Sequence, residues 1–176
     1  WVKNKHFDSR KPTLLLNSHH DTVKPNQGYT NDPYNPKIED GKLYGLGSND
    51  AGGALVSLLH TFLHFAFDET LNYNLIYAAT AEEEISGKSG MELVKQEFEN
   101  IDLAIVGEPT LMQPAIAEKG LMVLDGTVTG KAGHAAREEG INAIYEALND
   151  IQWFQKFQFQ KVSQSLGPIK MNLTVI

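Results

Sequence analysis

Imidazole and carboxylate side chains recur along this chain at points where short apolar or glycine-rich stretches end. Imidazole nitrogen and carboxylate oxygen are ligands of catalytic zinc, which keeps one coordination position open for water. Two zinc ions only a few ångströms apart also need a shared anion, because its charge offsets their repulsion. The sequence therefore offers the ligand set of a hydrolytic metal centre in His19, Asp50, Glu84 and Glu108.

Neighbouring carboxylates suit the supporting roles of such a centre. Asp50 precedes an apolar helical stretch with two glycines behind it, so it can bridge two ions, act as a helix N-cap, or do both. Asp21 lies two residues after His19 on the same side of an extended chain, where it can fix the histidine tautomer. The adjacent carboxylates of residues 82–84 would repel one another without a cation, so one can bind metal while another acts as general base.

The elements that must position these side chains alternate between strand and helix. Apolar runs predict buried strands, and apolar residues at helical spacing predict helices between them. The expected order is a strand at 13–18, a helix from about 50, a strand at 74–80, a helix at 90–99 and a strand at 102–106. This order implies an α/β fold with a mainly parallel sheet flanked by helices. Ligands of such sheets bind outside the carboxyl ends of the strands, where the clusters can converge.

Two further regions differ from this pattern. Residues 23–47 are rich in Pro, Gly, Asn and Asp, which predicts a long surface loop with a hairpin at 38–44. Beyond residue 120 we expect a half-exposed strand at 121–130, a helix at 140–157 and a strand at 169–175.

We therefore place a domain boundary near residues 114–120. Residues 1–116 are expected to form a metal-binding catalytic domain, and residues 117–176 part of a smaller α+β domain. The chain begins without Met and ends on an alternating strand pattern, so we expect it to be part of a longer protein.

The composition excludes several classes of function. A net charge of −7 and a pI near 5.3 argue against nucleic acid as a partner, since binding to phosphates requires clustered Lys and Arg. The longest apolar stretch, residues 51–67, is too polar for a membrane span, and the first residues lack the apolar core of a signal peptide. Cysteine is absent, so metal must be held by His, Asp and Glu, and a reducing cytoplasm is the expected location.

Five short motifs, in order, carry a specific resemblance. They are residues 18–23 (SHHDTV), 45–53 (GLGSNDAGG), 80–84 (TAEEE), 106–110 (VGEPT) and 130–136 (GKAGHAA). Together they resemble the successive motifs of the zinc-dependent family that contains acetylornithine deacetylase, succinyl-diaminopimelate desuccinylase, aminoacylase and glutamate carboxypeptidase. The match covers residues 13–148 in the family's order and approximate spacing, and chance agreement of five ordered motifs is improbable.

The resemblance implies a di-zinc exopeptidase-like fold with two zinc ions in each active site, cobalt or manganese being alternatives. His19 and Glu108 would bind one ion, Glu84 would bind the other, and Asp50 would bridge them. It also implies a cis peptide bond between Asp50 and Ala51.

The catalytic roles follow from the same resemblance. Asp21 would orient His19, and Glu83 would act as general base and acid. The second domain would be the dimerisation or lid domain of a homodimer, with His134 reaching into the partner's active site to stabilise the oxyanion.

Residues 107–120 look closest to the acetylornithine deacetylases, which favours hydrolysis of an N-acyl amino acid in arginine biosynthesis. A dipeptidase or carboxypeptidase of the same family is one alternative, and a non-catalytic, metal-stabilised dimerisation module is another.

The chain departs from the family pattern at two points. Glu82 stands where many relatives have Asp, so the register of base and ligand could shift by one, although Thr80 and Ala81 favour Glu83 and Glu84. The further histidine that the second zinc requires has no match in the chain. His60 and His64 lie four apart on a predicted helix, but residue 61 is Thr rather than the Glu of a metalloprotease helix, so we expect them on the helix flank.

Overall fold

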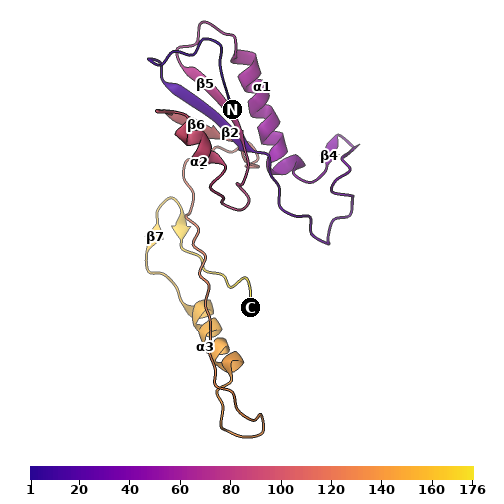
Figure 1. Ribbon diagram of the computed structural model, residues 1–176, viewed down its shortest axis with the longest axis vertical. Coiled ribbons are helices and arrows are strands. Elements are labelled where there is room, and N and C mark those ends of the chain that lie inside the picture. The colour runs from indigo at the N-terminus through magenta and orange to yellow at the C-terminus, as the bar shows by residue number, and fades with distance from the viewer. The chain divides into compact units, whose positions relative to one another are not determined.

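The protein is described here in a computed structural model that covers residues 1–176 (Figure 1). Two compact units make up the chain, residues 1–113 and residues 114–176, so the division falls at the start of the predicted boundary region.

The first unit is built on a four-stranded sheet with the order β1-β5-β2-β6. The central strand β2 (Thr13–His19) runs parallel to both β5 (Asn74–Thr80) and β6 (Leu103–Val106). The short strand β1 (Val2–Lys3) pairs with β5 in the antiparallel sense. The mainly parallel sheet predicted from the sequence is therefore confirmed, and its three parallel strands end along one edge.

Each face of the sheet packs against one helix, which gives the α/β arrangement of three layers (Figure 1). Helix α1 (Ala54–Phe65) covers Leu16 and Tyr77 on one face, with Phe62 buried between them. Helix α2 (Met91–Gln96) covers the opposite face. It is shorter than predicted because Phe98 and Ile101 turn back to pack against the sheet before β6 begins.

The long loop contains the predicted hairpin, formed by β3 (Lys37–Glu39) and β4 (Lys42–Tyr44). Asp40 and Gly41 join the strands with φ angles of 50° and 72°, the left-handed pair that a tight two-residue hairpin turn needs. A wide, kinked turn, η1 (Ser48–Gly53), then leads directly into α1.

The second unit contains helix α3 (Ala143–Lys156) and a small hairpin of β7 (Val162–Ser163) and β8 (Gly167–Pro168). The side chain of Asn142 caps α3 by accepting the Ile144 N–H at 2.9 Å. The helix lies within the predicted range of 140–157.

The strands predicted at 121–130 and 169–175 are wrong. Both segments lack regular structure, and Leu121 and Val175 are 88% and 84% exposed. A strand needs a partner along its backbone, and no segment of the second unit pairs with either one. No residue of this unit is buried. No helix of the protein combines the length and the apolarity needed to cross a membrane.

A buried amide links the starts of neighbouring strands in the first unit. Asn74 is fully buried at the start of β5. Its Oδ1 accepts the Asp8 N–H at 2.9 Å, and its Nδ2 donates to the carbonyl oxygens of Asp8 and Lys11 at 2.8 and 3.1 Å. These bonds satisfy backbone groups that have no sheet partner, in a unit whose buried side-chain polar atoms all have partners.

Replacing this amide tests its contribution. Asn74→Ala removes the partners of part-buried backbone groups of Asp8 and Lys11, so we expect the free energy of unfolding in urea to fall by about 1–3 kcal/mol. The exposed Asn100→Ala is the matched control and should change it by less than about 0.5 kcal/mol. Equal effects of the two substitutions would contradict a structural role for Asn74.

Candidate metal centre

The centre is organised around His19, whose side chain is only 1% exposed at the carboxyl end of β2. Its Nδ1 lies 3.0 Å from the backbone oxygen of Asp21 and 3.4 Å from Asp21 Oδ1. A carbonyl oxygen can only accept, so Nδ1 carries the hydrogen. In the neutral ring the Nε2 lone pair therefore faces outward, as a metal ligand requires.

Asp50 reaches this nitrogen from the kink in η1. Its Oδ1 lies 3.1 Å from His19 Nε2, and the peptide bond between Asp50 and Ala51 is cis, as expected from the resemblance. Gly47 adopts a φ of 73°, and the Thr22 side chain leaves no room for a Cβ atom there. Gly52 donates its N–H to Gly47 O at 2.9 Å. No side chain caps α1, so the Asp50 carboxylate does not act as its N-cap and remains available at the site.

The three consecutive glutamates after β5 point in different directions. Glu82, with a φ of 61°, folds back so that its Oε2 accepts the Ser89 N–H at 2.8 Å. Glu84 instead lies at the site, where its Oε1 accepts the Val23 N–H at 3.3 Å. Oε2 of Glu83 lies 3.8 Å from His19 Nε2. Because Glu82 turns away, the arrangement favours the register in which residues 83 and 84 serve the site.

Asp21 also holds this glutamate segment in place. Its carboxylate oxygens accept the backbone N–H groups of Glu83 and Glu84 at 3.4 and 3.2 Å. Burial alone would raise the pKa of Asp21, but these backbone donors and His19 bring it below the usual value. Sequence reasoning assigned Asp21 to His19 alone, because backbone N–H donors leave no trace in residue types.

Glu108 completes the group from the end of β6, with Oε2 3.8 Å from His19 Nε2. Burial raises the pKa of this carboxyl, and the charges of Glu83, Asp50 and Glu84 raise it further, against the opposing effect of His19. The pKa of His19 is also raised, since its Asp21 contact and these carboxylates outweigh the effect of burial.

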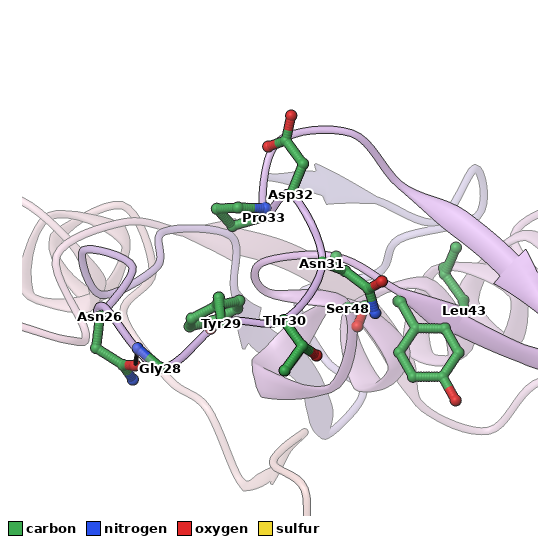
Figure 2. Close-up of a pocket in the computed structure, with 11 residues that line it drawn as sticks. Asn26, Gly28, Tyr29, Thr30, Asn31, Asp32, Pro33, Leu43 and Ser48 are labelled. Atoms are coloured by element: carbon green, nitrogen blue, oxygen red, sulfur yellow. Dashed lines mark hydrogen bonds between the residues drawn. The ribbon is translucent and has the colours of Figure 1, made fainter.

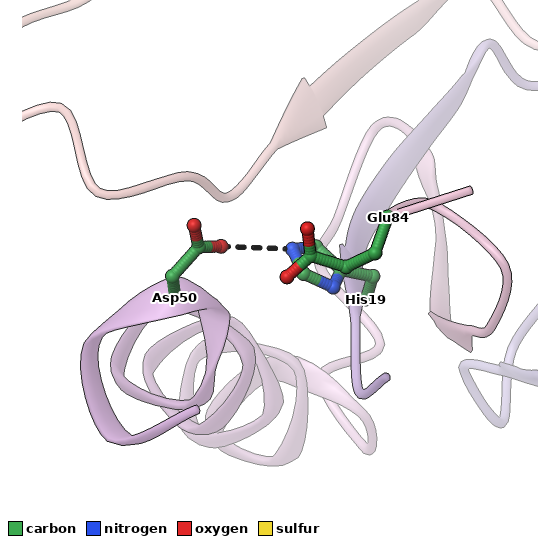
Figure 3. Close-up of side chains that lie close together, drawn as sticks. All are labelled: His19, Asp50 and Glu84. Carbon is green, nitrogen blue, oxygen red and sulfur yellow. Dashed lines mark hydrogen bonds and ion pairs between the residues drawn. The ribbon is translucent and has the colours of Figure 1, made fainter. Parts of the chain in front are cut away.

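The donor set fits a divalent metal. His19, Asp50 and Glu84 offer ligand atoms that all lie within 4.8 Å of one another (Figure 3). Glu108 faces the same imidazole but lies outside that mutual distance. No Lys or Arg forms an ion pair with any of these carboxylates, so a bound cation is the natural source of compensating charge.

Two cavities lie near the loops of the first unit. The smaller, of about 290 Å³, contains His19, Glu83 and Glu108 in its wall. The larger, of about 360 Å³, lies between residues 26 and 48, and the only carboxylate along it, Asp32, points away from its other lining side chains (Figure 2). Ionisable groups that can do chemistry therefore converge on the smaller cavity.

The remaining histidines lie outside this group. His20 is exposed beside the site. His134 belongs to the second unit, where it is exposed and its Nδ1 accepts the Ala136 N–H at 3.1 Å. His60 and His64 are exposed on α1, as expected from the sequence.

Comparison with known proteins identifies the family of the chain. The model of peptidase family M20/M25/M40 matches residues 15–168. The chain belongs to this family. All the residues of the metal group lie within the matched range, as does His134.

Relatives of this M20 family chain include two named acetylornithine deacetylase. The protein from Proteus mirabilis (strain HI4320) is 37% identical over 133 residues, which cover 74% of this chain and 34% of the relative. That from Klebsiella pneumoniae (strain 342) is 38% identical over 139 residues, covering 78% and 36%. The chain thus spans about a third of the length of these relatives. Human carnosine dipeptidase 1 is a similar solved structure, with 28% identity, a TM-score of 0.42, and coverage of 58% of this chain and 23% of that one.

The contacts of Asp21 predict how the M20 chain holds metal. Asp21→Asn keeps the shape of the side chain but removes the charge that holds His19 and the N–H groups of Glu83 and Glu84. We expect zinc affinity, measured by competition with a chromophoric chelator, to fall by about 10- to 100-fold. Asp32→Asn, on the larger cavity, is the control and should leave it unchanged. Unaltered affinity in Asp21→Asn would refute this positioning role.

Proposed function

We propose that the protein containing this chain is a metal-dependent hydrolase that cleaves the amide bond of an N-acyl amino acid. The observation that carries the proposal is the convergence of His19 at the end of β2, Asp50 in η1 and Glu84 after β5, with Glu83 and Glu108 facing the same imidazole. The relatives named acetylornithine deacetylase support the substrate class. We also propose a role in arginine biosynthesis, from the resemblance of residues 107–120 to the acetylornithine deacetylases, and a cytoplasmic location, which suits a chain without cysteine.

Zinc is the proposed metal, with two ions in the complete site. His19 and Glu108 would hold one ion, Glu84 the other, and Asp50 would lie between them. A zinc ion held there supplies Lewis acidity, which makes water a stronger nucleophile at neutral pH and polarises an amide carbonyl. Cobalt or manganese can take the same nitrogen and oxygen ligands.

Glu83 is the proposed general base and acid. Its side chain is 54% exposed and lies in the wall of the cavity that contains His19, so it can meet both substrate and solvent. Its carboxylate would take the proton of the attacking water and later deliver it to the nitrogen of the leaving amine. The carboxylate fragment and the free amine are then the two products.

The second unit is proposed to form a homodimer and to cover the site as a lid. Its apolar side chains support this role, since Leu121, Met122, Val123 and Leu124 are each at least 73% exposed. His134 is proposed to reach the partner's site, where a protonated or neutral imidazole can donate to the oxyanion of the tetrahedral intermediate. Mixed dimers, one subunit carrying His134→Ala and the other Glu83→Gln, should regain part of the activity that each variant lacks alone.

Separate substitutions in the glutamate segment test the assigned roles. Glu83→Gln should keep zinc but lower kcat on N-acetyl-ornithine by about 10²- to 10⁴-fold, because the proton acceptor is lost. Glu84→Gln should lose zinc. Glu82→Gln should retain both, since Glu82 lines the same cavity but its carboxylate accepts the Ser89 N–H and is not among the grouped metal ligands.

The measurements are zinc content by elemental analysis and turnover of the whole protein. Loss of zinc in Glu83→Gln with retention in Glu84→Gln would show that the register is displaced. A fully metal-loaded protein that hydrolyses no N-acyl amino acid would overturn the proposed function itself.

A further inference from the structure

Two histidines on the outer surface of α1 are unrelated to the site above. His60 and His64 lie four residues apart in the same helix, and both side chains are exposed. Neither forms an ion pair. The buried side chain of this helix, Phe62, packs against the sheet, so the two imidazoles belong to the surface that the fold leaves free.

Helix geometry brings these two rings together. Residues four apart are neighbours on a helix surface, with about 5–6 Å between their Cβ atoms, and their side chains lean in the same direction. The His64 ring also packs edge-on against Phe65, with centroids 4.7 Å apart and an interplanar angle of 88°. One ring is thus already held by a neighbour, which reduces the conformational entropy lost when both nitrogens bind one ion.

The local charge favours a cation. His64 lies in the last turn of α1, where the unpaired carbonyl groups of the helix end carry partial negative charge. Asp68, four residues after His64 and just beyond this end, donates its N–H to Phe65 O at 3.1 Å and adds a negative side chain to this end of the helix. No Lys or Arg occurs between residues 54 and 68 to oppose a bound ion.

We propose that His60 and His64 form a second metal site, which binds a divalent transition-metal ion through two imidazole nitrogens and fills its other positions with water. The site is separate from the centre at the sheet edge, since His60 and His64 lie about 9 and 15 Å along the axis from the first residue of α1. No third ligand atom is required, and Asp68 contributes its charge.

The ligand chemistry distinguishes the two sites. The centre around His19 offers one nitrogen among several carboxylate oxygens, whereas the helix site offers nitrogen alone. Imidazole pairs suit Ni²⁺, Cu²⁺ and Zn²⁺, with affinity greatest for Cu²⁺. Ni²⁺ is the most useful probe, because it binds imidazole well and is less prone than Cu²⁺ to bind other surface groups.

Calorimetric titration of metal-free protein with NiCl₂ tests the proposal. The background is Glu84→Gln, which weakens the first centre and leaves α1 unchanged. We expect this protein to bind one Ni²⁺ equivalent, and His60→Ala or His64→Ala to weaken binding at least about tenfold, since one imidazole cannot chelate. His6→Ala, which removes a histidine paired with Glu69 outside the helix, is the matched control and should bind as before.

Thermal unfolding gives a second readout, because an ion that binds only the folded state raises its stability. Ni²⁺ should raise the midpoint of the Glu84→Gln protein and of its His6→Ala variant, but not of the variants at His60 or His64. Alanine favours helix, and His60→Gln offers a second exposed replacement, so circular dichroism can confirm that α1 persists. Equal Ni²⁺ binding with and without the two histidines, or no binding in the Glu84→Gln background, would overturn the proposal.

The result is independent of the proposed hydrolase activity. His60→Ala and His64→Ala should leave turnover of N-acetyl-ornithine unchanged, while Glu83→Gln should lower turnover and keep Ni²⁺ at the helix. Loss of one property without the other therefore identifies which of the two proposals has failed.

Discussion

In the first unit several carboxylates lie around one buried imidazole and repel one another. Asp50, Glu83 and Glu108 each face His19 Nε2 within 4.0 Å, and no Lys or Arg pairs with them. The parallel register brings His19, Glu83 and Glu108 to the same edge, since His19 lies opposite Thr80 and Asn17 opposite Val106. The turn η1 adds Asp50. Without Lys or Arg beside these carboxylates, a bound cation would offset this electrostatic cost.

Asp21 links the ends of two neighbouring strands. It holds His19 on one side and the N–H groups of Glu83 and Glu84 on the other, so a single carboxylate positions the proposed ligand histidine and the proposed base together. The opposite end of the sheet uses a neutral amide, Asn74, for a similar purpose. Charge is used where a cation can offset it, and an uncharged group is used where burial is complete.

Sequence reasoning succeeded where local pattern and topology agree. Residues 74–80 form a strand with the predicted bounds, and parallel pairing then brings together side chains that are far apart in the sequence. It failed at 121–130 and 169–175, because strand formation there depends on backbone partners that no short sequence pattern can supply. The hydrogen bond between the Glu82 side chain and the Ser89 N–H could not be predicted from the sequence either, because it depends on a left-handed backbone conformation at Glu82.

Helix α1 shows how one element can serve two purposes without conflict. Its inner face, through Phe62, closes the core over Leu16, and its first turn follows the kink that delivers Asp50. Its outer face is exposed, and His64 there contacts only the neighbouring Phe65 ring, so histidines on this face cost little stability and are free to bind an ion. The inner face of α1 holds the helix on the sheet, and the proposed helix site and the metal centre share no ligand. Metal binding at the far end of α1 should therefore add stability without disturbing the centre at its start.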